Sequence, residues 1–204
     1  MKKLRARIRR RLKRQRASRC AQFHLRSLTF EPLEARFLLT TFTVVNLLDA
    51  PNAPVGSLRE ALNNANANPG PDRIEFAPSL TGTLALAGGE LSISDALTIA
   101  GPGSANLTID AQSQSRIFDI TATTGDVNIC GLTVTNGSVS GDNAFDQATS
   151  QYSNMYSGGA IRSVTSGNFT IDACVISGSD TTGTHAQGGG LYAAGPVTLI
   201  NSTI

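Results

Sequence analysis

Positively charged side chains are scarce in this sequence after residue 39. The first 39 residues contain thirteen Lys or Arg and only two carboxylates, Glu31 and Glu34, so their net charge is +11. Residues 40–204 contain no lysine and only four arginines against thirteen Asp or Glu, so their net charge is −9. Because an acidic surface repels phosphate, this composition argues against nucleic-acid binding by residues 40–204.

Several residue types that carry chemistry are also rare or missing. The chain has no tryptophan, three cysteines and two histidines. No apolar run is long enough for a membrane-spanning helix or for the apolar part of an ordinary signal peptide, which needs ~7 to 15 residues. Motifs for a serine nucleophile, a phosphate-binding loop or a calcium-binding nonapeptide are absent. We therefore predict neither a metal nor a cofactor.

The three cysteines, Cys20, Cys130 and Cys174, do not have the spacing of a metal site. Cys174 falls in an apolar column of the repeat described next, which predicts a small buried side chain. Cys130 falls at a turn. A Cys130–Cys174 disulfide remains an alternative, and it would leave Cys20 unpaired.

The C-terminal part of the chain contains one short unit written twice, SGGAIRS…GNFTIDACVI and QGGGLYA…GPVTLINSTI. The segment VNICGLTV at 127–134 matches FTIDACVI position for position. In each unit apolar residues alternate with Thr, Asn or Asp, then a small or polar pair intervenes, which indicates strand, tight turn and strand. Such short strands bury their apolar face only when near-copies stack on them at ~4.8 Å.

With ~20 to 30 residues per unit, the pattern favours an all-β chain, namely a right-handed parallel β-helix of roughly five coils. The alternative is an antiparallel β-sandwich whose Thr-, Ser- and Gly-rich segments are similar by coincidence. Strands are expected at 40–48, 73–76, 83–86, 91–94, 96–101, 106–111 and 116–120. The domain boundaries predicted are a basic leader at 1–39, a cap strand and helix at 40–82, and coils at 83–204.

The basic stretch 1–19 is compatible with an export leader, a nucleic-acid-binding arm or a membrane-surface helix. Directly after it, Leu33-Glu34-Ala35-Arg36-Phe37-Leu38-Leu39 resembles the LEPR-XLL signature of large secreted and surface proteins of bacteria, with Ala35 in place of proline. The resemblance implies export or surface display, with the export machinery as a partner. The matching targeting residues are Leu33, Glu34, Arg36, Leu38 and Leu39.

A short helix is predicted after Gly56. Ser57 is a good N-cap, Glu60 stands where a capping box needs it, and Asn68-Pro69-Gly70 ends the helix. One apolar face is formed by Leu58, Ala61, Leu62 and Ala65, which suits a cap over the open end of stacked strands. Ser-Leu-Arg-Glu-Ala within this helix resembles the CSLREA-type segment that opens bacterial β-helix proteins, with Gly56 in place of cysteine. Arg59 and Glu60 are interpreted as capping and surface residues.

Two polar insertions, 138–156 and 177–187, interrupt the repeat just before its double glycine, so both should emerge on one side. The first carries candidate binding residues for an extracellular glycan or a surface protein. The alternative is that both are solvated loops without function. The double-glycine units resemble the GGA(I/L/V) repeats of polymorphic outer-membrane proteins, which implies an adhesin-like display stalk. The candidate binding residues are Asp142, Phe145, Asp146, Tyr152 and Tyr156.

Pectate and pectin lyases and polygalacturonases also have this fold, so a polysaccharide lyase or hydrolase is the second functional hypothesis. A lyase needs a basic residue, for which the coils offer only Arg116 and Arg162. A hydrolase needs two facing carboxylates. Asp110 and Asp172 each end a similar strand, and a shared face for the two is the arrangement that a hydrolase would need, whereas His185 is interpreted as an exposed bystander. We expect no catalytic residues in this chain, which ends mid-motif and is interpreted as part of a longer protein.

A third hypothesis is a basic-arm protein that binds nucleic acid inside the cell. It depends on the leader alone, because the acidic remainder does not suit phosphate.

Overall fold

The computed structural model describes residues 39–122 and 125–204, which belong to one compact unit. The regular secondary structure of this unit is short β-strands joined by turns and loops, with a single α-helix among the described residues. Most strands belong to three sheets, here called A, B and C. The described residues contain no helix that is long and apolar enough to cross a membrane.

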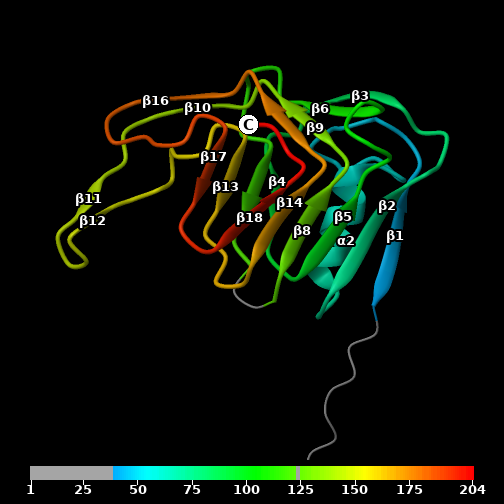
Figure 1. The fold of residues 1–204 in the computed structure, drawn as a ribbon, viewed down its shortest axis with the longest axis horizontal. Coiled ribbons are helices and arrows are strands. Elements are labelled where there is room, and N and C mark those ends of the chain that lie inside the picture. The colour runs from blue at the N-terminus through cyan, green and yellow to red at the C-terminus, as the bar shows by residue number, and fades with distance from the viewer. Residues whose placement is uncertain (1–38, 123–124) are drawn as a thin grey trace, which may run out of the picture. The chain divides into compact units, whose positions relative to one another are not determined.

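Sheet A contains six parallel strands, side by side in Figure 1, in the order β1 (Thr40–Val44), β2 (Asp72–Phe76), β5 (Leu97–Ala100), β8 (Val127–Cys130), β14 (Phe169–Asp172) and β18 (Val197–Ile200). Sheet B contains β3 (Gly82–Ala85), β6 (Leu107–Asp110), β9 (Thr133–Thr135) and β15 (Val175–Ser177). Sheet C contains β4 (Leu91–Ile93), β7 (Phe118–Ile120), β13 (Ile161–Ser163) and β17 (Leu191–Ala193).

From β2 onward, successive strands of these sheets belong to sheet A, then B, then C, and this order repeats along the chain. Every strand pair within these sheets is parallel, so the alternative of an antiparallel sandwich is wrong. In sheet A the residues that pair in one column, Asp72, Leu97, Val127, Phe169 and Val197, are separated by 25, 30, 42 and 28 positions. The long third interval contains the first insertion.

The strand register confirms the repeat read from the sequence. Phe169 pairs with both Val127 and Val197, and Ile161 pairs with Leu191. The inward columns are fully buried, as for Ile74, Ile99 and Ile129 of sheet A. Each such side chain contributes ~1.5 to 3 kcal/mol on burial, and it does so only because its neighbour in the column covers it.

The predicted helix is confirmed as α2 (Leu58–Ala67), which contacts β1, β2 and β4 at one end of sheet A (Figure 1). Its N-cap is Ser57, whose hydroxyl accepts a hydrogen bond from the Glu60 N–H. The Glu60 carboxylate accepts from the Gly56 N–H, one residue before the position that a capping box uses. The buried face consists of the four predicted residues, Leu58, Ala61, Leu62 and Ala65.

The opposite end of sheet A is different, because the inward side chains of β18 lie at the surface. Val197 and Leu199 are exposed, whereas Phe169 and Ile171, their neighbours in the same columns, are fully buried. The alternation of the sequence therefore marks an inward face here too, but no further described strand covers it.

Two expectations about the first residues of this unit are corrected. The first strand ends at Val44 and not at Leu48, because the chain then turns and Val45 donates to the carbonyl of Gly56. Arg59 is not a surface residue. Its guanidinium is largely buried and forms a double contact with Asp49, Nε to Oδ1 at 2.6 Å and Nη2 to Oδ2 at 3.0 Å.

Asp49 connects three segments, because it also accepts hydrogen bonds from the N–H groups of Ala87 and Gly88. Burial alone would raise the pKa of Asp49. The hydrogen bonds from Arg59 and from the two N–H groups outweigh burial and hold the pKa below its usual value.

We expect Asp49→Asn to lower the free energy of unfolding by about 2 kcal/mol at pH 7, because the charged partner of Arg59 is lost. A carboxyl with a lowered pKa in the folded state contributes its stability above its unfolded pKa of about 3.9 and loses it as pH falls through the folded value. Denaturant unfolding at pH 7 and pH 3 should therefore give a difference between variant and wild type that shrinks at pH 3. An equal difference at both pH values would contradict this role for the Asp49 charge.

Candidate functional site

The two polar insertions stack on each other. In the first, β10 (Ser138–Ser140) pairs in parallel with β16 (Asp180–Thr182) of the second. The ladder continues past the strands, because Gly141 donates to the carbonyl of Thr182 and Asn143 donates to that of Thr184. The prediction that both insertions emerge on one side is therefore confirmed, and in Figure 1 they extend together beyond the sheets.

Asn143 joins the insertions through a buried side chain. Its amide nitrogen donates to the Ser157 hydroxyl at 3.0 Å and to the carbonyl of His185 at 2.8 Å. Its amide oxygen accepts from the N–H of Tyr156 at 2.9 Å and from the Ser153 hydroxyl at 3.3 Å. One side chain thus fixes both ends of the first insertion to the second.

Three rings cluster where the first insertion extends furthest. Its tip is a hairpin of β11 (Phe145–Asp146) and β12 (Gln151–Tyr152), the one antiparallel pair among the described strands. The rings of Tyr152 and His185 stack with centroids 3.7 Å apart and 21° between their planes. Phe145 meets Tyr152 edge-on at 5.0 Å. We call these three residues the aromatic platform.

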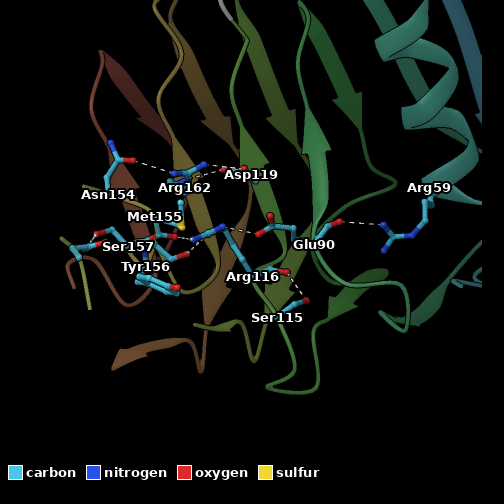
Figure 2. A network of polar contacts seen from close by, with 12 residues as sticks. Arg59, Glu90, Ser115, Arg116, Asp119, Asn154, Met155, Tyr156, Ser157 and Arg162 are labelled. Atoms are coloured by element: carbon cyan, nitrogen blue, oxygen red, sulfur yellow. Dashed lines mark hydrogen bonds and ion pairs between the residues drawn. The ribbon is translucent and has the colours of Figure 1, made fainter. Parts of the chain in front are cut away.

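Arg116 clamps the base of the first insertion, as Figure 2 shows. Its side chain is 4% exposed, and its guanidinium donates to the carbonyls of Met155 at 2.7 Å, Ser157 at 3.1 Å and Gly158 at 2.9 Å. It also forms an ion pair of 2.6 Å with Glu90. Arg116 therefore neutralises a carboxylate and satisfies three backbone acceptors at once.

A second clamp lies on the outward face of sheet C. Arg162 on β13 pairs in register with Asp119 on β7, and its guanidinium contacts both carboxylate oxygens at 2.7 and 2.9 Å. It also donates to the side-chain oxygen of Asn154 in the first insertion. The hydrogen bond to Asp119 raises the pKa of Arg162 against the opposing effect of burial. The insertion is thus fixed to sheet C by two arginines (Figure 2).

The five predicted binding residues have different roles. Asp142 accepts from the N–H of Thr184 at 2.6 Å, and this bond lowers the pKa of Asp142. Asp146 accepts from the Ala148 N–H and the Thr149 hydroxyl within its own hairpin, which lowers its pKa. The ring of Tyr156 lies directly over Gly141. Phe145 and Tyr152 remain about half exposed, so the structure leaves these two apolar rings open to solvent.

The two carboxylates considered for catalysis, Asp110 and Asp172, are not brought together. Asp110 ends a strand of sheet B and accepts hydrogen bonds from Gln112 and Asn136, whereas Asp172 ends a strand of sheet A. The prediction that they share a face is therefore wrong, since two residues alike in the sequence belong to different sheets. His185 is exposed as predicted, but it is not a bystander, because it stacks on Tyr152.

The cysteines follow the simpler of the two predictions. Cys174 is buried and free, and Cys130 is free too, so no Cys130–Cys174 disulfide is formed. Burial raises the pKa of the Cys174 thiol. Within 39–122 and 125–204, no group of three or more His, Cys, Asp or Glu side chains is placed to share a metal ion.

The basic leader and the targeting residues Leu33, Glu34, Arg36 and Leu38 lie outside the described residues. Leu39, the last residue of the motif, is exposed at the start of the described unit. The LEPR-XLL resemblance therefore stays a prediction.

Comparison with known proteins finds no matching family model, no matching curated protein and no matching solved structure. The functional argument therefore depends on the residues themselves. Sequence reasoning missed Asn143, Arg116 and Arg162 as organisers of the insertions. One signal pointed to the arginines. Residues 40–204 contain only four arginines against thirteen carboxylates, so each guanidinium was expected to pair with a specific acidic side chain.

Proposed function

We propose that this chain is part of an exported bacterial surface or secreted protein, a right-handed parallel β-helix that serves as a display or adhesion stalk. In this proposal the three sheets are the scaffold and the stacked insertions contact an extracellular glycan or surface protein. The observation that carries the proposal is the structure of the insertions. Polar loops without function would not need a buried arginine, a second arginine paired with a carboxylate and a buried asparagine to fix them.

The repeated order of sheets A, B and C supports a helical winding of the chain, because each circuit adds one strand to each sheet. Parallel strands joined by right-handed connections are strongly preferred in general, which supports the right-handed sense. The α-helix over the first strands supports a capped starting end.

The N-terminal 39 residues support export. They combine a net charge of +11 with a segment that resembles the LEPR-XLL signature. The folded part carries a net charge of −9 and no lysine, which does not suit the alternative of an intracellular nucleic-acid-binding protein.

Localisation tests the proposal. The tagged full chain, expressed in the source bacterium, should be found outside the cytoplasm and should be cleaved when protease is added to intact cells. Replacing Leu38 and Leu39 together with alanine should retain the chain in the cell, whereas Leu48→Ala, which alters an exposed leucine outside the motif, should not. Wild-type protein that stays soluble in the cytoplasm with its leader intact would refute export.

A polysaccharide lyase or hydrolase is the second candidate. It is favoured by one observation, the outward placement of Asp119 and Arg162 on sheet C beside the insertions. Both arginines that a lyase would use as a base already donate to several acceptors within the protein. A reducing-end assay detects cleavage of a polysaccharide. Cleavage by the wild type and none by Arg162→Ala or Asp119→Ala would refute the stalk proposal in favour of an enzyme.

A further inference from the structure

The tyrosines of this chain are concentrated in one region. All three of them, Tyr152, Tyr156 and Tyr192, lie in the first insertion or on β17, whose Tyr192 pairs in register with Arg162. Aromatic residues make up only 5% of the sequence. An aromatic-poor chain thus places two of its three tyrosines in the first insertion and the third on the strand paired with Arg162, which contacts that insertion.

The aromatic platform is held in position before any ligand arrives. Phe145 and Tyr152 are 50% and 47% exposed, yet their backbones belong to a paired hairpin, and His185 is fixed through its carbonyl by Asn143. Arg116 and Arg162 fix the base of the same insertion. Binding to such a surface does not have to order flexible loops first, so little affinity is lost to entropy.

From these observations we propose that the aromatic platform binds an uncharged carbohydrate. The C–H face of a sugar ring packs on an aromatic ring, and its hydroxyl groups need hydrogen-bonding partners around that ring. The hairpin also carries exposed polar residues, Asp146, Gln151 and Ser153, each next in sequence to one of the rings. This inference rests on the proposed function and specifies the ligand class of the same insertions.

Charge selects a neutral sugar over an acidic one. Each of the four arginines in the described residues forms an ion pair, with Asp49, Glu75, Glu90 or Asp119. Asp142 and Asp146 lie in the insertion itself with lowered pKa values, so they are ionised at neutral pH. A uronate, sulfate or sialic acid would therefore meet negative charge and no unpaired guanidinium among these residues.

The size of the apolar surface favours a sugar over a protein. In the first insertion the exposed large apolar side chains are Phe145, Tyr152 and Met155, surrounded by Ser, Asn, Gln and Asp. A stable protein interface needs about 800 Å² from each partner with a well-packed apolar centre. The apolar surface of two rings and one methionine is too small for such a centre, but it is the size of a few sugar units.

Isothermal titration calorimetry of the full chain tests the proposal with cellohexaose, xylohexaose and mannohexaose as neutral probes and hexagalacturonate as the acidic probe. We expect at least one neutral hexasaccharide to bind, with an affinity that changes little with salt. Hexagalacturonate should show no binding that depends on Tyr152, and its attraction to the basic residues 1–39 should be screened by salt. Tyr152→Ala should weaken the neutral probe about tenfold or more, because it removes the central ring. Tyr152→Phe, which keeps the ring, should restore most of the affinity lost in Tyr152→Ala, and Val55→Ala, a remote exposed site, should bind as the wild type does.

Three results would overturn the inference: no binding of any neutral probe, binding of hexagalacturonate that Tyr152→Ala abolishes, or unchanged binding of the neutral probe by Tyr152→Ala. If the chain is found outside the cell but binds no neutral probe, the inference fails and the proposed export and display stand. If a neutral probe binds but the chain is cytoplasmic, the inference stands and the proposed function fails.

Discussion

Replacing Arg116 with methionine should lower the free energy of unfolding by about 3 kcal/mol or more. Methionine fills the space of the arginine stem but cannot donate to the carbonyls of Met155, Ser157 and Gly158. Each buried acceptor left without a donor costs ~1 to 3 kcal/mol. Glu90, the fourth partner, is 42% exposed and regains water, so it adds little to the loss.

Arg73→Met is the matched control for this prediction. Arg73 also forms an ion pair, with Glu75, but both side chains are more than a third exposed. Such a surface pair contributes ~0 to 1 kcal/mol, so the control should unfold almost as the wild type does. Guanidinium titration measures both variants, and hydrogen exchange of residues 153–160 shows whether the insertion loosens first. Equal losses for the two variants would contradict the clamp.

Replacing Gly159 with alanine should lower the free energy of unfolding by about 3 kcal/mol, at the upper end of overpacking effects. An alanine Cβ at this position would lie 2.1 Å from the carbonyl oxygen of Asp180 and 2.4 Å from that of Gly189. Both contacts are with backbone, so no side chain can rotate away. Relief requires the neighbouring strands to separate, which breaks the stacking on which burial depends.

Gly190→Ala provides the control for Gly159. Gly190 occupies the column position that Ala160 fills in the previous unit, and an added Cβ would approach only the side chains of Ile176 and Ile204. We expect a change below about 1 kcal/mol. Thermal unfolding measures the stability of both variants. If Gly159→Ala were as stable as Gly190→Ala, close backbone stacking at Gly159 would be contradicted.

The scaffold could be predicted from the sequence because it repeats. Phe169 and Ile171 recur as Val127 and Ile129, and a column of like residues is a signal that alternation and alignment can detect. The helix had a local signal as well, since the Ser57 cap and the apolar face are set by neighbours within one turn. Where the chain turned without a repeat, as after Val44, the predicted boundary was wrong.

The site was harder to predict because its partners are distant in sequence and follow no period. Arg116 donates to carbonyls about forty positions away, and backbone carbonyls look alike in every sequence. Asp142 and Asp146 were predicted to bind a ligand on composition alone, yet both accept hydrogen bonds from the insertions themselves. Asn143 between them, whose side chain forms four hydrogen bonds, had no distinguishing neighbour in the sequence.

Distances between spin labels on the outward face of sheet A test the parallel stacking most directly. Residues Thr41, Arg73, Thr98, Asn128, Thr170 and Thr198 form one outward column. With the native cysteines replaced by serine and labels on introduced cysteines, the Thr41 and Thr198 positions should be five strand spacings apart, about 24 Å between backbones. Labels at Thr41 and Thr170 should be one spacing closer, about 19 Å. Equal distances for the two pairs, or a shorter distance to Thr198, would contradict the stacked order of strands from which the site and its proposed function follow.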